Sequence, residues 1–181
     1  YDACLNLGGF SNISMNRNGK RIAFDICPIN IILNHYANQL GLDYDKDGQI
    51  ASTGKINQSL VEELNQLAFY HQSYPKSLGF EWVEKEFLTI VEKYDLCIED
   101  KLFSCVEHMV HQLNNTFKEY DINKVLITGG GVRNQFLFNV LKSKSNTELI
   151  IPNDNLIDFK EALIFAYLGY RRYLGKVNCL A

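Results

Sequence analysis

Hydrophobic and polar positions alternate, or apolar residues run together, in three short segments at the start of the chain, residues 3–7, 10–16 and 20–26. This two-residue period is typical of β-strands. Turn-forming residues separate the segments, with Gly8-Gly9 after the first and Asn16-Arg17-Asn18-Gly19 after the second. The pattern therefore predicts three consecutive antiparallel strands joined by tight turns.

The remainder of the chain changes to a helical period and then to a strand–helix rhythm. A helix is expected to begin at Pro28, because apolar residues recur every three or four positions from Ile31 to Leu40 and Gly41 ends the pattern. A long amphipathic helix is expected at 98–120. The elements predicted beyond it are a strand at 124–128, a helix at 132–144, a strand at 148–151 and a helix at 156–174.

Residues from about 42 to 97 interrupt this order, and we interpret them as a helical insertion that packs as a small cap. The block opens with an acidic loop, Asp43-Tyr44-Asp45-Lys46-Asp47-Gly48, and continues with helices expected at 58–70 and 82–94. Three aromatic residues are expected in the core of the cap rather than on a stacking platform for a ligand: Phe80, Trp82 and Phe87.

Three strands, a helix, and then strand, helix, strand and helix predict an α/β fold of the ribonuclease H-like type. Its sheet would be mixed, with an antiparallel three-strand meander and helices on both faces. A chain of 181 residues that is 46% hydrophobic can bury one sizeable core. The chain enters a strand within three residues of Tyr1 and has no initial methionine, so we expect a fragment whose upstream half is missing.

The composition excludes several classes of function. The net charge is −3 and the basic residues are scattered, so no nucleic-acid-binding surface is predicted. No window approaches the ~18 apolar residues of a membrane span. The five cysteines are widely spaced and form no Cys-x-x-Cys pair, which favours reduced, mostly buried thiols in a cytosolic protein. They are Cys4, Cys27, Cys97, Cys105 and Cys179.

A glycine triplet stands between a predicted strand and a predicted helix. The apolar run Lys124–Thr128 is broken by Gly129-Gly130-Gly131, and a helical apolar pattern follows. Without Cβ atoms, this segment lets a flat or anionic ligand approach the backbone. The start of the next helix adds free N–H groups and the positive end of its dipole. The triplet therefore predicts a nucleotide site, with a turn needed only for packing as the alternative.

A second glycine turn, Gly8-Gly9, is expected to form the opposite wall of such a site. Asn6, Ser11 and Asn12 flank it, and short amide and hydroxyl groups beside exposed backbone N–H groups can cradle phosphate. A hairpin with two glycines at its tip also occurs without any functional reason. Both interpretations stay open for this turn.

Two further motifs are incomplete. The segment Ser52–Ile56 contains the Gly-Lys pair of a P-loop, but Ile56 lacks the hydroxyl that binds magnesium and Gly48 lies one residue too far upstream. The acidic loop matches the opening of a calcium loop, yet Gly54 stands where a bidentate glutamate is required. A hydrogen-bonded turn and a loop facing a bound substrate are the interpretations that remain for the acidic loop.

Candidate metal ligands and acid/base groups are few. His108 and His111 share one face of the long helix without a carboxylate or cysteine cluster to complete a metal site, so a solvated face is predicted. The best candidates for paired carboxylates are Asp25, at the end of the third strand, and Glu161, in the first turn of the last helix. A structural cap and a helix-dipole partner are their respective alternatives.

Six short motifs follow one another along nearly the whole chain. They are Asn6-Leu-Gly-Gly-Phe-Ser-Asn-Ile13, Phe24-Asp-Ile-Cys-Pro-Ile-Asn30, Tyr44-Asp-Lys-Asp-Gly48 with Ala51 and Gly54, Pro75-Lys-Ser-Leu-Gly79, Gly129-Gly-Gly-Val-Arg-Asn134, and Lys160-Glu-Ala162 before Phe165-Ala166. Together they resemble the C-terminal lobe of the anhydro-N-acetylmuramic acid kinases. That family of bacterial enzymes recycles peptidoglycan and belongs to the superfamily of sugar kinases, actin and heat-shock chaperones.

The resemblance implies an actin-like ATPase domain, one of two lobes that close on ATP, with the N-terminal lobe absent from this chain. It places nucleotide contacts at Gly8, Gly9, Asn12, Gly129, Gly130, Gly131 and Asn134. It places substrate contacts at Asp25, Asn30 and Glu161. The family's first phosphate loop and its catalytic aspartate lie upstream, so the resemblance implies no catalytic and no metal-ligating residue here. Mg²⁺ would be held mainly by the nucleotide and the missing lobe.

Such kinases transfer the γ-phosphate of ATP to the 6-oxygen of anhydro-N-acetylmuramic acid while water opens the 1,6-anhydro ring, which gives N-acetylmuramic acid 6-phosphate. Glycine loops and magnesium supply the positioning and charge neutralisation that phosphoryl transfer needs, and a carboxylate must activate the water. The implied protein is a cytoplasmic bacterial kinase that acts on a small sugar and forms a homodimer at full length. Its other partner would be its own N-terminal lobe, with no nucleic acid or membrane. The fragment alone is expected to be inactive.

This chain departs from the family pattern after the third strand, where Ile26, Cys27 and Ile29 replace Thr, Gly and Gly. The loss of two glycines makes a close backbone approach at that turn harder. Two other hypotheses therefore stay open. One is a non-catalytic nucleotide-binding or interaction module on the same fold, and the other is a different sugar kinase of the superfamily.

Overall fold

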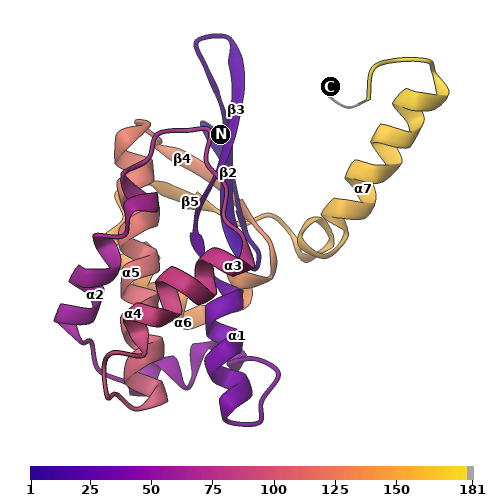
Figure 1. Cartoon of the computed structure of the whole chain (residues 1–181). Coiled ribbons are helices and arrows are strands. Elements are labelled where there is room, and N and C mark those ends of the chain that lie inside the picture. Colours follow the sequence, from indigo (N-terminus) through magenta and orange to yellow (C-terminus); the bar gives the residue numbers. More distant parts are fainter. Residues whose placement is uncertain (179–181) are drawn as a thin grey trace. The chain divides into compact units, whose positions relative to one another are not determined.

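The computed structural model describes residues 1–178, which form two compact units (Figure 1). The first unit, Tyr1–Ile151, contains a five-stranded sheet and all the described helices except the last. The second begins at Pro152 and contains α7 (Asp154–Tyr173). The elements described next belong to the first unit unless α7 is named.

The sheet has the strand order β3-β2-β1-β4-β5. Its strands are β1 (Ala3–Leu7), β2 (Phe10–Arg17), β3 (Lys20–Pro28), β4 (Lys124–Thr128) and β5 (Glu148–Ile150). β1, β2 and β3 are antiparallel neighbours, whereas β1 pairs with β4 and β4 with β5 in parallel. The meander and the mixed sheet confirm the predicted α/β order. β3 continues to Pro28, two residues beyond the predicted end.

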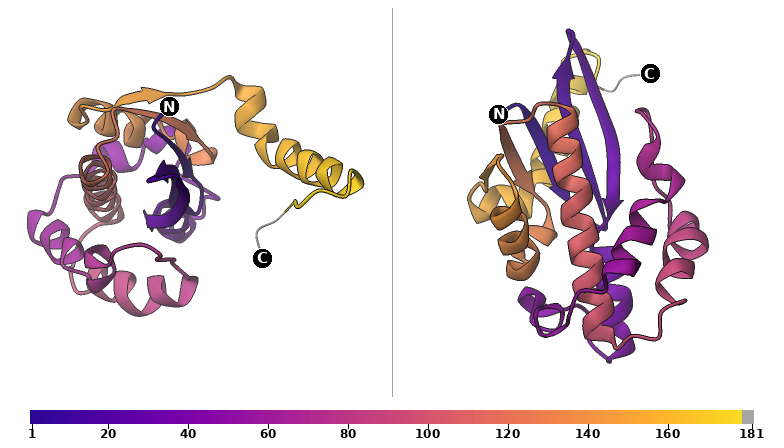
Figure 2. Two further views of the ribbon diagram at one scale, coloured as in Figure 1. Left: turned by 90° about the horizontal axis from the view of Figure 1, so that it is seen from above. Right: turned by 90° about the vertical axis from the view of Figure 1, so that its left-hand side faces the viewer.

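Apolar side chains alternate with polar ones along the strands, so the apolar side chains gather on one face of the sheet, and that face forms the core. Leu5, Ile13 and Phe24 are direct neighbours on three strands, and all three are buried. The long helix α5 (Ile98–Glu119) contacts β3 and also packs against α1 (Asn30–Gln39) and α6 (Gln135–Lys144). Figure 2 shows α5 running alongside the sheet. Its buried apolar side chains recur at helical spacing: Leu102, Val106, Met109, Leu113 and Phe117.

Two helices begin later than the sequence predicted. Pro28 closes β3 instead of opening a helix, and α1 starts at Asn30. The residues after Gly129 form a short 3₁₀ turn (Gly130–Arg133), so α6 starts at Gln135 rather than at residue 132. Both delays bring a turn of irregular backbone to the same edge of the sheet.

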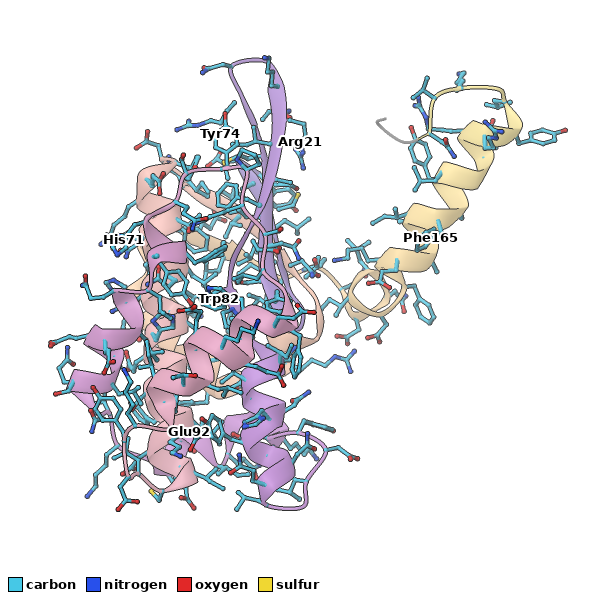
Figure 3. All side chains as sticks on the ribbon, viewed as in Figure 1. Arg21, His71, Tyr74, Trp82, Glu92 and Phe165 are labelled. Carbon is cyan, nitrogen blue, oxygen red and sulfur yellow. The ribbon has the colours of Figure 1, made fainter. Side chains whose placement is uncertain are left out.

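Residues 42–97 form short helical pieces, which differ in length from the predicted helices. They are α2 (Gln58–Asn65), α3 (Phe80–Trp82), a π-helical turn (Val83–Leu88) and α4 (Thr89–Val91), with 3₁₀ turns at Lys46–Gly48, Ala51–Thr53 and Ala68–His71. The block packs on α5 through α2 and the Ala51–Thr53 turn. Glu92, labelled in Figure 3, adds a polar link, because it accepts hydrogen bonds from Tyr36 on α1 (2.7 Å) and Lys101 on α5 (2.7 Å).

The aromatic residues of this block divide between core and surface. Phe87 is fully buried, and its ring lies 6.3 Å from that of Trp82. Phe80 is 51% exposed, so the prediction that it belongs to the core was wrong. Phe80 is the first residue of α3, and no preceding helical turn encloses its ring.

His108 lies in the core, so the prediction of a solvated face was wrong for this residue. It is fully buried, with Nδ1 2.7 Å from Asn65 Oδ1 and Nε2 2.9 Å from the Tyr70 hydroxyl. Burial lowers the pKa of His108 to about 3. His111 is exposed and bonds to Asn115 on its own helix. The face of α5 that looked solvated is covered by α2 and the residues after it, which periodicity within α5 could not reveal.

Among residues 1–178 the structure contains four free cysteines. Cys27 and Cys105 are buried, and burial raises the pKa of each thiol to about 12. Cys4 and Cys97 are exposed, so the expectation of mostly buried thiols holds for half of these four. Cys179 lies outside the described residues.

The last helix, α7, begins at the side chain of Asn153, which accepts a hydrogen bond from the Leu156 N–H (3.0 Å). It starts two residues earlier than predicted. As a result Glu161 is the eighth residue of the helix, so the helix-dipole explanation for it no longer applies. Whether α7 covers a face of the sheet stays a prediction.

Within residues 1–178 no helix combines the length and the apolar character that a membrane crossing requires.

Candidate functional site

The sheet brings the two predicted glycine turns to the same edge. β1 and β4 are parallel neighbours, with Asn6 opposite Thr128, so the segments that follow them leave the sheet side by side. Gly129 has a φ of +92°, and a Cβ at that position would lie 2.6 Å from the carbonyl oxygen of Leu7. A Cβ at Gly131 would lie 2.9 Å from the Leu7 Cβ. Only residues without side chains allow this close approach of the two turns.

The side chain of Asn6 lies between the two turns. Its Nδ2 is 3.1 Å from where a Cβ of Gly8 would stand, and its Oδ1 is 2.8 Å from where a Cβ of Gly129 would stand. The sequence marked Asn6 only as a neighbour of the first turn and did not include it among the site residues. The signal that identifies it is the parallel pairing of β1 with β4, which cannot be seen within either segment alone.

The first glycine turn is fixed from one side by the start of α1. The backbone N–H groups of Ile29 and Ile31 donate to the Gly9 carbonyl (2.8 and 3.3 Å), and that of Asn30 donates to the Gly8 carbonyl (3.2 Å). A Cβ at Gly9 or at Gly130 would meet nothing within 4 Å. Each turn therefore has one backbone position with open space beside it.

Polar side chains continue from this edge in a row across four strands. In register, Thr128 is opposite Asn6, Asn6 is opposite Asn12, and Asn12 is opposite Asp25. Residues paired in this way point to one face of the sheet, and it is the face opposite Leu5 and Ile13. The row thus unites two predicted site residues, Asn12 and Asp25, with Asn6. Ser11 points to the core, where its hydroxyl donates to the Cys27 carbonyl (2.9 Å).

Asp25 has structural partners as well as a place in this row. Its Oδ2 accepts a hydrogen bond from the Leu78 N–H (2.8 Å), and its own N–H donates to the Lys76 carbonyl (3.1 Å). The carboxylate therefore anchors the 75–79 segment of the insertion to β3. This contact differs from the acid/base role and the capping role that the sequence suggested, and the substrate contact implied for Asp25 by the resemblance stays a prediction.

A cavity of about 310 Å³ lies beside the second glycine turn. Its wall combines Asn30 and Asn34 of α1, residues 44–47 of the acidic loop, and Gly130 and Asn134. Asn134 is also the N-cap of α6, since its Oδ1 accepts a hydrogen bond from the Leu137 N–H (2.9 Å). The cavity joins three predicted site residues, Asn30, Gly130 and Asn134, to the acidic loop, for which the sequence had left two interpretations open.

The acidic loop folds as a hydrogen-bonded turn. Both oxygens of Asp45 accept backbone hydrogen bonds, from Ile50 (2.9 Å) and Ala51 (3.0 Å). Gly48 has a φ of +72°, and a Cβ there would overlap the Asn134 and Phe136 side chains. The loop therefore packs closely on the start of α6. Within residues 1–178 no group of three histidine, cysteine or acidic side chains is placed to hold a metal ion.

The residues that depart from the family pattern lie at the end of β3 and directly after it, and they direct their side chains inward. Ile26, Cys27 and Ile29 are all buried, and Ile29 Cγ2 lies 3.5 Å from where a Cβ of Gly131 would stand. They fill the core beneath the turn. Glu161, the third predicted substrate contact, is an exposed residue of α7 in the second unit, so its role stays a prediction.

Solved structures similar to this chain define its class by fold. An activator of 2-hydroxyisocaproyl-CoA dehydratase from Clostridium difficile, with bound ADPNP, matches with a TM-score of 0.54 over 99% of this chain and 64% of its own, at 18% identity. The xylulose kinase of Lactobacillus acidophilus matches with a TM-score of 0.54 over 96% of this chain and 38% of its own, at 12% identity. The fold is thus that of the actin-like ATPases and sugar kinases.

The sequence relatives narrow this class to one family. The model of the anhydro-N-acetylmuramic acid kinases matches residues 1–177, and the chain belongs to that family. The kinase of this name from Aliivibrio fischeri is 31% identical over 94% of this chain and 49% of its own length. That from Sulfurimonas denitrificans is 28% identical over 94% of this chain and 50% of its own. The chain spans about half the length of these curated relatives.

Proposed function

We propose that this chain is the nucleotide-binding lobe of an ATP-dependent kinase acting on anhydro-N-acetylmuramic acid. The γ-phosphate of ATP is transferred to the sugar 6-oxygen, water adds at the anomeric carbon as the 1,6-anhydro bridge opens, and N-acetylmuramic acid 6-phosphate and ADP leave. The observation that carries the proposal is the pairing of two glycine turns at one edge of a parallel strand pair, with Asn6 between them. Family membership supports the choice of reaction.

The backbone of the two turns binds the polyphosphate. Gly9 and Gly130 have open space where a side chain would stand, so phosphate oxygens can reach their N–H groups. Asn12 extends this surface from β2, and the remaining glycines, Gly8, Gly129 and Gly131, hold the two turns close together. Mg²⁺ supplies charge neutralisation on the phosphates when bound, and it is carried mainly by the nucleotide and the other half of the protein.

The cavity beside Gly130 takes the nucleoside end of ATP. Asn30 and Asn134 offer amide groups on two of its walls, and Asn34 offers a third amide group from α1. Asp25, at the end of the polar row, faces the sugar in this proposal, and a substrate contact at Glu161 stays an implication of the family resemblance. Asn30, which lines the cavity, stands at the start of α1 between the nucleotide and the sugar.

The partner of this lobe is the other half of a protein about twice as long, which is the length of the curated relatives. That half contributes the catalytic aspartate and the first phosphate loop. We further propose that the full-length kinase is a cytoplasmic homodimer, as the family resemblance implies.

The test is the ATP-dependent formation of N-acetylmuramic acid 6-phosphate by the full-length protein, with Gly9→Val and Gly130→Val as variants. Each valine fills the open space that the phosphates need, so KM for ATP should rise roughly tenfold or more for each variant. The matched control is Gly19→Asn at the tip of the β2–β3 hairpin. That glycine has a φ of +76° and no neighbour within 4 Å, and asparagine tolerates this conformation.

Three results decide the proposal. Formation of the 6-phosphate with both valine variants impaired and the control unchanged supports it. Nucleotide binding without sugar-dependent turnover would favour the non-catalytic module, for which the apolar filling of the turn after β3 is the supporting observation. Turnover with another sugar and none with the anhydro sugar would indicate a different kinase of the same fold.

A further inference from the structure

A second cavity, of about 200 Å³, lies on another side of the first unit and shares no lining residue with the cavity beside Gly130. It is bounded by β3, by the C-terminal half of α5, and by the segment 65–76 that leads from α2 to the 75–79 segment. Figure 3 labels two residues of this segment, with His71 towards α5 and Tyr74 beside the β-hairpin that carries Arg21.

The chemistry of its wall is polar on the α5 side. Gln112, Thr116 and Glu119 follow one another at helical spacing and line the cavity, and Asn65 and His71 face them from the insertion. Aromatic surface is also present, because Phe24 and Tyr120, with ring centroids 5.3 Å apart, both contribute to the lining. Amide, hydroxyl and imidazole groups beside aromatic rings form a surface suited to a small ligand that carries several hydroxyl groups.

Gln112 directs an acceptor into this space. The residue is 6% exposed, and its Nε2 donates to Asn65 Oδ1 (2.9 Å). Within residues 1–178, the Oε1 atom of Gln112 has no hydrogen-bond partner. Every side-chain oxygen or nitrogen of that range that is fully shielded from solvent does have a partner, so Oε1 must be accessible to solvent. The Oε1 atom therefore opens on the cavity, where a ligand hydroxyl can donate to it.

Lys76 supplies the positive charge of the cavity. Its Nζ donates a long hydrogen bond to the Phe69 carbonyl (3.3 Å) and lies over the rings of Phe69 (4.7 Å) and Phe24 (6.0 Å). Within residues 1–178 no carboxylate lies within 4.0 Å of this ammonium group. Burial lowers the pKa of Lys76, and Glu119, an exposed residue of the rim, and Cys27 act on it in the opposite direction without offsetting burial. A half-buried ammonium without an ion-pair partner gains from an anionic ligand.

We propose that this cavity binds a hydroxylated carboxylic acid of monosaccharide size, with its carboxylate on Lys76 and a hydroxyl group on Gln112 Oε1. The site lies apart from the glycine turns, so its occupation does not require nucleotide. The neutral amides select hydroxyl groups, and Lys76 selects the acid over the corresponding neutral sugar.

The experiment compares D-glucuronate with D-glucose, because the two differ only in the carboxylate that replaces the hydroxymethyl group. Each is titrated into the full-length protein while the amide NMR shifts of residues 111–119 are followed. Glucuronate should bind roughly tenfold more tightly than glucose or better, as expected for one charge-assisted hydrogen bond in a half-buried site. Lys76→Gln should abolish this preference and leave glucose binding unchanged.

Two controls accompany that variant. Lys76→Arg keeps the positive charge and should keep the preference, and Lys85→Gln, an exposed lysine of the same insertion, should behave as the parent protein. If Lys76→Gln does not fold, Gln112→Glu replaces it and should weaken glucuronate binding selectively. The proposal is overturned if glucuronate causes no shifts in α5, if the two sugars bind equally, or if the charge-removing variant keeps the preference.

Discussion

Asn6 is the residue on which both glycine turns converge. Its amide atoms stand next to the positions where Gly8 and Gly129 would carry a Cβ, and it belongs to the polar row with Asn12 and Asp25. A side chain in this place can set the separation of the two turns and offer a donor to a phosphate oxygen. In the proposed kinase, Asn6 would thus be a positioning residue that also faces the nucleotide.

Replacing Asn6 by alanine should therefore lower kcat/KM for ATP in the full-length kinase roughly 10–100-fold. Asn6→Asp should be at least as harmful, because it places a negative charge beside the phosphates. Asn16→Ala, on an exposed position further along β2, is the control and should leave the kinetics unchanged. Steady-state kinetics with varied ATP would contradict this role if Asn6→Ala behaved like the control.

Gly129 and Gly130 are adjacent but should respond differently to a methyl group. At Gly129 the φ of +92° and the carbonyl of Leu7 oppose any Cβ, so Gly129→Ala should cost about 2 kcal/mol or more of unfolding free energy. At Gly130 the space is open, so Gly130→Ala should stay within about 0.5 kcal/mol of the parent. Urea unfolding of both variants measures the difference, and equal stabilities would show that the Leu7 contact does not constrain the turn.

The buried His108 should make stability depend on pH. Its folded pKa of about 3 lies below the ordinary value of 6.5, so the unfolded chain takes up a proton first as the pH falls. The stabilising contribution is complete above pH 6.5 and decreases by about 1.4 kcal/mol per pH unit from there towards pH 3. Urea unfolding at pH 5 and pH 7 should give a smaller difference for His108→Gln than for the parent, whereas an equal difference would contradict the assignment.

At the scale of elements, the insertion depends on close contacts with α5. A Cβ on Gly54 would overlap the backbone at Glu99 and Asp100, in the first turn of that helix. The Lys55 N–H also donates to the Asp100 carboxylate (2.7 Å). Gly54, which stands where a calcium loop would require a glutamate, is thus the point where the loop contacts α5.

Gly54→Ala should loosen this contact and cost about 1–3 kcal/mol, because backbone atoms cannot move aside as the end of a side chain can. Hydrogen exchange at the amides of residues 51–57 reports the loosening directly. Gly41→Asn, where the φ is +75° and the space is open, serves as the control. Unchanged protection in Gly54→Ala would mean that the loop does not depend on this approach.

The strands, α1 and α6 could be predicted from the sequence because each has a clear period and a glycine or proline nearby, and α5 could be predicted from its long helical period alone. The pieces between residues 42 and 97 were less predictable, since α2 ends at Asn65 and a π-helical turn interrupts the following helix. The burial of His108 and the exposure of Phe80 depend on which element covers which, information that a local pattern does not contain. The same reason hid Asn6, whose position follows from strand pairing.

At the scale of the whole molecule, the first unit places its two glycine turns, the polar row and the larger cavity at one edge of the sheet. The two glycine turns could be anticipated because a strand followed by glycine and a helix start is recognisable locally, whereas site roles for Asn30 and Asn134 were implied only by the family resemblance. The second unit adds α7 with Glu161. In the proposed kinase, the other half of the protein meets this edge, so that phosphates and sugar lie between the two halves.

The most direct measurement is a crystal structure of the full-length protein with a non-hydrolysable ATP analogue and Mg²⁺. We expect phosphate oxygens within about 3.2 Å of backbone nitrogens in both turns, at Gly9 and at Gly130, with the Asn6 amide beside them. The nucleoside should occupy the cavity lined by Asn30 and Asn134. A polyphosphate bound away from either turn, or a nucleotide that leaves this edge of the sheet empty, would contradict the account.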